Sequence, residues 1–149
     1  MNLTLTTLIV SRDQIYDTLS SKEKESYNTA KLISEMAEYG YLEHMRVNGD
    51  KHGADIIFYR SSDCSVLKVQ LNGRLTFKKS YIGKELCVAF PIRQNNKTSW
   101  YLYDHDELLK IVLEQSNISS TSSWVEKGSY SWPRIPQFVL ENITILETT

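Results

Sequence analysis

Residues 53–72 read GADIIFYRSSDCSVLKVQLN, and this stretch decides the predicted fold. Residues 54–59 (ADIIFY) are rich in strand-forming side chains, and residues 65–72 (SVLKVQLN) alternate strictly between the two sides of a strand. The polar segment 60–63 between them is typical of a hairpin turn. The alternation gives the second strand a mainly polar face and an apolar face: Val66, Lys68, Gln70 and Asn72 against Leu67, Val69 and Leu71.

Elements on both sides complete a mixed pattern. Upstream, residues 22–39 have helical spacing, with Leu32 and Met36 on one stripe and Gly40 as the terminating residue. The other predicted elements are strands at 41–47, at 86–90 (ended by Pro91) and at 99–103, and a helix at 105–115 that Asp104 caps. This order predicts an α/β (α+β) class, with a mixed central β-sheet flanked by helices.

The two ends of the chain are less regular. Residues 3–10 fit either a strand or the lead-in to a helix, and residues 12–19 fit a short helix. Residues 116–149 form an aromatic-rich extension without helical or strand period until 136–146, where a last short helix or strand is predicted. No linker or repeat divides the chain, so residues 1–149 are predicted to form a single domain.

Composition limits the kind of protein. The 149 residues are 41% hydrophobic and 23% charged, with a net charge of −1, which is ordinary for a soluble globular protein. No apolar run approaches the roughly 18 residues of a membrane helix, and the first residues lack the features of a signal peptide. We therefore expect a cytoplasmic protein with no membrane partner. Cys64 and Cys87 have no metal-ligand spacing, and we expect reduced, buried or half-buried thiols.

A basic stripe follows the predicted hairpin. Between residues 68 and 84 there are five cations and no acid: Lys68, Arg74, Lys78, Lys79 and Lys84. Such a run is usually a solvated face, but it can also contact phosphates. In the functional interpretation Arg74, Lys78, Lys79 and Lys84 bind nucleic acid, and Arg134 of the C-terminal extension joins them. Tyr130 and Trp132, which alternate with Arg134, are interpreted first as packing residues.

Asp55 and Gln70 are the candidate metal ligands. If the two strands pair as a hairpin, a carboxylate and a second oxygen donor lie on neighbouring strands near one end, an arrangement that suits Mg²⁺. Lys68, on the same face as Gln70, could hold an attacking water or steady a phosphate. The alternative is structural, because an aspartate at the start of a strand is often a turn or cap residue and a glutamine on a strand is often simply solvated.

The stretch GADIIFY followed by LKVQLNGR resembles the core of the PD-(D/E)XK, or restriction-endonuclease-like, nuclease superfamily. The variant with glutamine as the middle residue is similar to small bacterial nucleases, including some intron-type homing endonucleases. Further stretches resemble a family of small bacterial proteins of this fold: KEKESYN, VQLNGRLTF, YIGK and WYLYDHDEL. The resemblance spans roughly residues 22 to 110.

This resemblance implies a metal-dependent DNA endonuclease that uses Mg²⁺ or Mn²⁺ and cuts double-stranded DNA. By the same match, Asp55 is a metal ligand, Gln70 is the second ligand and the backbone carbonyl of Leu71 is the third. A glutamate of the first helix completes such sites; Glu25 is the first choice because it shares the stripe of Leu32 and Met36, and Glu23 is the second. A first-turn acid that favours the helix dipole explains Glu25 equally well. A chain of this size is expected to work as a homodimer or tetramer.

One position departs from the pattern. The lysine of the superfamily falls two residues after Gln70, where this chain has Asn72, and asparagine lacks the positive charge that would assist reaction at a phosphate. Three interpretations stay open. Lys68 takes over the role, or the domain binds DNA without cutting it, or Asn72 is an engineered substitution that inactivates the site. A protein-interaction or inhibitor domain without any nucleic-acid role is the remaining alternative.

Overall fold

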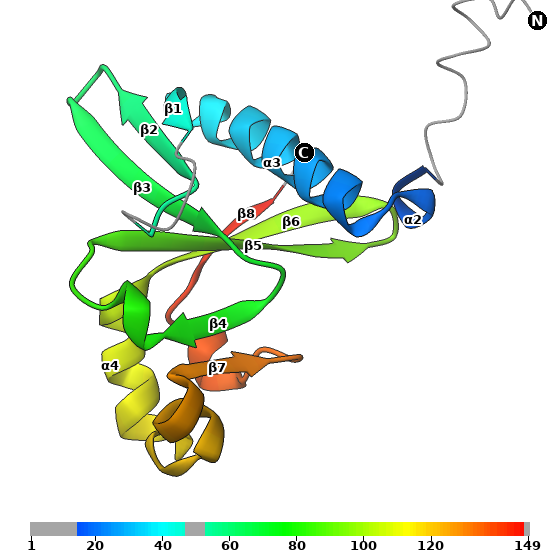
Figure 1. Ribbon diagram of the computed structural model, residues 1–149. Helices are drawn as coiled ribbons and strands as arrows, with labels where there is room; N and C mark the ends of the chain where they lie inside the picture. The colour runs from blue at the N-terminus through cyan, green and yellow to red at the C-terminus, as the bar shows by residue number, and fades with distance from the viewer. Residues whose placement is uncertain (1–14, 47–52, 148–149) are drawn as a thin grey trace, which may run out of the picture.

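The computed structural model describes residues 15–46 and 53–147 (Figure 1). Its centre is a six-stranded sheet in the order β1-β2-β3-β5-β6-β8, in which β3 and β5 are parallel and all other neighbours are antiparallel. The strands are β1 (Leu42–Arg46), β2 (Ile56–Arg60), β3 (Ser65–Leu71), β5 (Leu86–Gln94), β6 (Lys97–Asp104) and β8 (Thr144–Glu147). The predicted mixed sheet flanked by helices is therefore confirmed at the level of class.

A second, smaller sheet and the helices cover the large sheet. The small sheet pairs β4 (Leu75–Lys78) with β7 (Ser129–Trp132). The α-helices are α2 (Ile15–Thr18), α3 (Ser21–Glu38), α4 (His105–Gln115) and α5 (Gln137–Leu140), and shorter helical turns are η2 (Lys79–Tyr81), η3 (Ile118–Ser120) and η4 (Ser123–Lys127). In the described residues, no helix is both long and apolar enough to cross a membrane.

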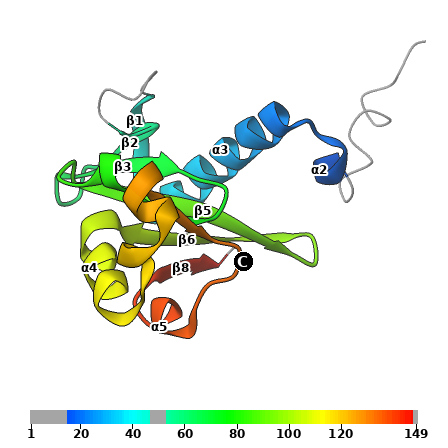
Figure 2. The ribbon, with the colours of Figure 1, turned by 60° about the horizontal axis from the view of Figure 1, so that its bottom comes forward.

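The large sheet separates two hydrophobic cores. On one face lies α3 (Figure 1). It buries Leu32 and Met36 against Phe58, Val69 and Trp100. On the other face, α4, α5 and the small sheet pack together (Figure 2), and their buried residues include Leu75, Phe77, Val88, Val112 and Val139. Burial of both faces supplies most of the stabilising free energy. The predicted apolar face of β3 is the one that meets α3.

Helix α3 begins with a capping box. The backbone N–H of Glu23 donates to Oγ of Ser20, and the backbone N–H of Ser20 donates to the Glu23 carboxylate. Ser20 is therefore the N-cap, and the helix begins at Ser21, one residue before the predicted start. The predicted end of the helix is confirmed, since Gly40 follows with a left-handed φ of +82°.

The hairpin of β2 and β3 has the predicted form, with Ile56 opposite Val69 and Arg60 opposite Ser65. Strand β1 confirms the prediction for 41–47 within the described residues, and α2 confirms the second part of the predicted helix at 12–19. The segment 3–10 lies outside the described residues. Cys64 and Cys87 are free, but Cys64 is exposed rather than buried.

Two predictions about strands were wrong. Strand β5 does not end at Pro91 but continues to Gln94. Its pairing with β3 ends at Ala89, so a proline N–H is not needed on that side, while Pro91 lies opposite Trp100 of β6. Residues 129–132 were expected to lack strand structure, yet they form β7 because β4, also unpredicted, pairs with them. A four-residue strand carries too little pattern to be recognised alone.

Gly53 makes a close approach just before β2. Its φ is +71°, and a Cβ built on it would lie 2.7 Å from Cδ1 of Leu86 and 3.2 Å from Cδ of Lys84. Leu86 is 2% exposed and cannot readily move aside. The segment that leads into Asp55 is therefore pressed against the start of β5.

We expect Gly53→Ala to destabilise the fold more than Gly83→Ala, measured as the free energy of unfolding in urea. Gly83 also has a left-handed φ, of +78°, but no atom lies within 4 Å of its Cβ position, so its cost is that of the backbone alone, about 1–2 kcal/mol. Gly73→Ala, with neither feature, should be nearly neutral. Equal losses for Gly53→Ala and Gly83→Ala would show that the approach to Leu86 is not tight.

Candidate metal and nucleic-acid site

The carboxylate of Asp55 terminates the pairing of β2 with β3. The backbone N–H of Asp55 donates to the carbonyl of Val69 (2.9 Å), and the backbone N–H of Leu71 donates to Oδ2 of Asp55 (2.9 Å). The register ends with Ile56 opposite Val69, so Asp55 lies just before the pairing and is bonded to Val69 and Leu71, on either side of Gln70. Asp55 thus acts as a cap residue, because its carboxylate accepts the backbone N–H of Leu71 in place of a backbone carbonyl.

Gln70 brings an amide to the same point of β3. Its Nε2 lies 3.5 Å from the carbonyl oxygen of Leu71, a long contact. The two ends of a glutamine amide are assigned from hydrogen bonding, so either its N–H₂ or its oxygen can face this region when a ligand is present. The structure therefore brings a carboxylate, an amide and a backbone carbonyl together around Leu71.

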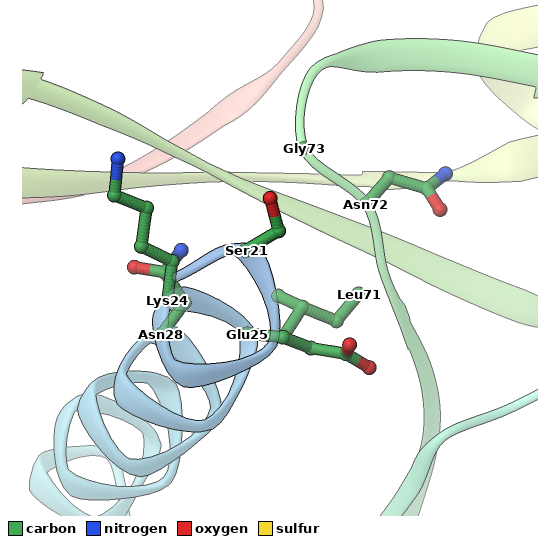
Figure 3. A pocket seen from close by; sticks show the side chains of 7 residues that line it. All are labelled: Ser21, Lys24, Glu25, Asn28, Leu71, Asn72 and Gly73. Atoms are coloured by element: carbon green, nitrogen blue, oxygen red, sulfur yellow. The ribbon is translucent and has the colours of Figure 1, made fainter. Parts of the chain in front are cut away.

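A hollow of about 380 Å³ adjoins this point, between the first turns of α3 and the end of β3 (Figure 3). It is lined by Ser21, Lys24, Glu25, Asn28, Leu71, Asn72 and Gly73. Glu25 extends its carboxylate from α3 toward β3, beside Leu71 (Figure 3). Glu23 is committed elsewhere: hydrogen bonds from the backbone and side chain of Ser20 lower the pKa of its carboxyl group. Of the two predicted glutamates, the structure brings Glu25 to the site.

Asn72 points away from α3 (Figure 3). Its Oδ1 accepts a hydrogen bond of 3.4 Å from the hydroxyl of Tyr81, in η2. Its Nδ2 is buried and has no hydrogen-bond partner among the described residues. An orphaned buried amide costs about 1–3 kcal/mol, which makes this position a place where a ligand or water would be stabilising. The side chain of Asn72 is thus turned toward η2, although the residue also borders the hollow.

Lys68 lies on the Gln70 side of β3, as the alternation predicts. It is half-buried, lies opposite Ile57 of β2 and beside Leu86 of β5, and forms no ion pair with any described acid. Diagonal neighbours on paired strands are about 7–8 Å apart, which is within the reach of a lysine side chain. Lys68, the cation of β3, therefore lies on the same face as Gln70 and two residues before it.

The donors at this site are oxygens of mixed type. Within residues 15–46 and 53–147, no group of three or more histidine, cysteine, aspartate or glutamate side chains is placed to hold a metal ion. The set described above contains two carboxylates, of Asp55 and Glu25, together with the Gln70 amide and the Leu71 carbonyl. All are hard donors of the kind that Mg²⁺ takes. The predicted metal therefore has chemically suitable residues, and its binding stays a prediction.

The predicted basic stripe is divided over several elements. Arg74 is exposed before β4, and Arg134 is exposed after β7, so the two flank the same end of the small sheet, where Leu75 pairs with Trp132. Lys84 packs its stem near Gly53. Two lysines lie over aromatic rings: Nζ of Lys78 is 5.4 Å from the centre of Tyr81, and Nζ of Lys79 is 5.4 Å from the centre of Trp124.

The aromatic residues of the extension pack, as the first interpretation held. Tyr130 and Trp132 make an edge contact with ring centres 4.6 Å apart, and Trp132 meets Phe77 at 5.8 Å. Both belong to the core on the α4 side of the sheet. The two rings cover this core at the small sheet, and Arg134, two residues after Trp132, is exposed.

His105 holds the basic segment in place, and sequence analysis missed this. The fully buried ring accepts a hydrogen bond from the backbone N–H of Lys78 at Nε2 (3.2 Å), so Nδ1 carries the proton and donates to Asp106 (2.9 Å). The other oxygen of Asp106 accepts from the backbone N–H of Gly83 (2.8 Å). The residues between Lys78 and Gly83 are thereby tied to the start of α4.

Burial lowers the pKa of His105, although its hydrogen bond to Asp106 acts in the opposite direction. The ring is therefore neutral in the fold. Burial would raise the pKa of Asp106, but the hydrogen bonds from His105 and Gly83 prevail and lower it. A signal for this network was present in the sequence, because acids flank the histidine at the start of a predicted helix, but its partners Lys78 and Gly83 are far away in the chain.

Comparison with protein family models, with curated protein sequences and with solved structures found no significant match for this chain. The chemistry assigned to the site therefore depends on the geometry around Leu71 and on the resemblance of its motifs. The six-stranded mixed sheet with flanking helices is compatible with that resemblance at the level of class.

We expect the fold to lose stability as the pH falls below about 6.5, the ordinary pKa of histidine. The folded pKa of His105 is lowered, so the unfolded chain binds the proton first and is favoured. Urea unfolding at pH 7.5 and 5.5 measures the loss. His105→Gln should be less stable at pH 7.5 by about 1–3 kcal/mol, because the buried N–H of Lys78 loses a well-placed acceptor, yet it should lose less on acidification.

His44→Gln is the control, because His44 is exposed and should leave the pH dependence unchanged. An undiminished loss between pH 7.5 and 5.5 in His105→Gln would assign the effect to other groups.

Proposed function

We propose that this chain is a metal-dependent DNA endonuclease with a restriction-endonuclease-like fold, of the restriction or homing kind. The observation that carries the proposal is the meeting of oxygens at Leu71. The Asp55 carboxylate is bonded to its N–H, the Gln70 amide lies at its carbonyl, and Glu25 extends toward it from α3. The ordered motif set of the sequence supports the same conclusion.

Mg²⁺ or Mn²⁺ would be held by Asp55, Glu25, Gln70 and the carbonyl of Leu71. When bound, such an ion supplies a nucleophilic water of lowered pKa and neutralises charge on the phosphate. Two carboxylates balance the charge of one divalent ion, and the amide and carbonyl add neutral oxygens. The bond between Leu71 N–H and Asp55 orients this carboxylate before any metal arrives.

Lys68 supplies the missing cation in this proposal. It is on the same side of β3 as Gln70 and lacks a described acid as partner, so its charge is available to a phosphate. Arg74, Lys78, Lys79, Lys84 and Arg134 bind the DNA backbone beside the site, on the far side of the sheet from α3. Cleavage of both strands of a duplex then takes two copies of the chain, as a homodimer or tetramer.

A second candidate is a non-catalytic DNA-binding module of the same fold. Asn72 favours it, because the side chain at the position of the superfamily lysine is neutral and bonds to Tyr81. In this case the bond between Asp55 and Leu71 is a structural cap and needs no metal. The basic residues would bind DNA with a strong dependence on salt and none on Mg²⁺.

Cleavage of supercoiled plasmid and genomic DNA with Mg²⁺ or Mn²⁺ tests the proposal. The chain itself should cut. Asp55→Asn keeps an oxygen that can accept from Leu71 but loses the charge, and we expect its rate to fall more than about 100-fold, since even indirect metal partners contribute 10–100-fold. Lys68→Gln should lower the rate by a similar factor. Lys110→Gln, on the exposed side of α4, is the matched control and should cut normally.

Asn72→Lys separates the alternatives. Cleavage by this variant alone would mean an intact nuclease scaffold that lacks one cation, and it would contradict the role given to Lys68. DNA binding without cleavage by any variant would favour the binding module. Neither binding nor cleavage would leave a protein-interaction role.

A further inference from the structure

A group of cations and tyrosines surrounds the first half of α3, beside the hollow. It consists of Tyr16 of α2, Lys24, Tyr27 and Lys31 of α3, and Arg93 of β5, and we refer to it as the tyrosine–cation cluster. The two rings meet edge to face with centres 5.1 Å apart. The Arg93 guanidinium lies 4.6 Å from the Tyr16 centre and 5.9 Å from the Tyr27 centre.

The lysines lie over the same rings. Nζ of Lys24 is 5.2 Å from the centre of Tyr16, and Nζ of Lys31 is 5.5 Å from the centre of Tyr27. Contacts of this kind at a partly exposed site contribute about 0.5–1 kcal/mol each, enough to hold a long side chain without neutralising it. The three charges are therefore fixed in place but remain positive toward the solvent.

No described acid neutralises these charges. The ion pairs of the described residues join other partners, and none includes Lys24, Lys31 or Arg93. On α3, Glu23 accepts from the backbone of Ser20 and Glu25 extends toward β3. Glu35, one turn after Lys31, forms no ion pair with it. Fixed cations without acidic partners are suited to a polyanion.

The cluster adjoins the candidate site. Lys24 lines the hollow together with Glu25 and Leu71, and Asn28, which also lines it, donates to the Tyr16 hydroxyl (3.2 Å). In Figure 3, Lys24 and Glu25 leave the helix in different directions, so the hollow has one basic and one acidic side. A strand whose phosphate reached the oxygens at Leu71 would continue over Lys24 toward Arg93 and Lys31.

We propose that the tyrosine–cation cluster binds the sugar–phosphate backbone of the DNA that enters the site. The rings are covered by the protein's own cations, so base stacking is not their role, and binding is independent of sequence. That the polyanion is DNA rests on the proposed function. The arrangement of the charges is independent of that proposal. The surface is separate from the basic stripe at residues 74–84, which lies across the sheet from α3.

Salt-dependent binding tests this proposal without cleavage. Fluorescence anisotropy of a labelled DNA duplex is measured in EDTA over about 50–200 mM NaCl, where each phosphate contact adds about 0.9 to the slope of log K against log salt. We expect Lys31→Gln and Arg93→Gln each to reduce the slope by about 0.9, and the double variant by about 1.8. Lys24 is left unchanged because it lines the hollow. Lys110→Gln is the control for loss of an unrelated surface charge.

Arg93→Lys distinguishes charge from packing. If Arg93 only anchors α2, both Arg93→Lys and Arg93→Gln will lower the melting temperature while the salt slope stays that of the unaltered chain. If it binds phosphate, Arg93→Lys will keep the slope and Arg93→Gln will lose it.

Unchanged slopes in both Lys31→Gln and Arg93→Gln would overturn the proposal, even for a chain that cuts DNA with Mg²⁺. A chain that never cuts but shows the predicted slope changes would retain the cluster and reject the endonuclease. Failure to bind DNA at all would also overturn it, and binding to phosphatidylserine vesicles that depends on the same residues would then assign the cluster to a lipid surface.

Discussion

The hydrogen bond from Leu71 N–H to the Asp55 carboxylate is the interaction on which the candidate site depends. The chain enters the β2–β3 pairing two residues after Gly53, where the approach to Leu86 leaves little room for a side chain. A carboxylate then takes the position of a missing backbone acceptor. The same geometry leaves an anionic group at the end of a buried strand, where the proposed metal binding and the termination of the strand would use one side chain.

The two faces of the sheet contribute different things to this point. From the α3 side come Glu25 and the hollow, and from the other side come Gln70, Lys68 and the tie between Asn72 and Tyr81. The neutral ring of His105 fixes the segment that carries Tyr81, because its Nε2 accepts from the backbone N–H of Lys78 and its Nδ1–H donates to Asp106. The segment from Lys78 to Gly83 is therefore positioned by a neutral histidine, through a hydrogen bond to its backbone and not through an ion pair.

Local pattern explains what could be predicted from the sequence. The alternation in residues 65–72 and the stripe of Leu32 and Met36 are properties of one element each, and the hairpin and α3 were found. The failures at Pro91, β4 and β7 concern residues whose structure depends on a neighbour far away in the chain. A proline is tolerated in a strand only where the adjacent strand has ended, which no local window reveals.

The candidate site follows the same division. The nearness of Asp55 to residues 69–71 could be predicted because one short hairpin brings these segments together. The tyrosine–cation cluster and the His105 network were missed because they join α2, α3 and β5, or β4 and α4. Lys24 and Lys31 also lie in a helix rich in acids, so a count of charge along the chain hides them. Whether these lysines are neutralised depends on which acids are bonded elsewhere, and only the structure shows those bonds.

The pairing of β4 with β7 has a consequence for how the protein is made. Strand β4 leaves the ribosome well before β7, and β6 well before β8, so neither can complete its sheet until the later part of the chain has been synthesised. Such non-local pairs are slow to form and leave strand edges open in the meantime. The α3–β1–β2–β3 segment, whose contacts are close in sequence, can collapse first. The oxygens at Leu71 can thus come together before the small sheet, which follows Arg74 and contains Lys78, is complete.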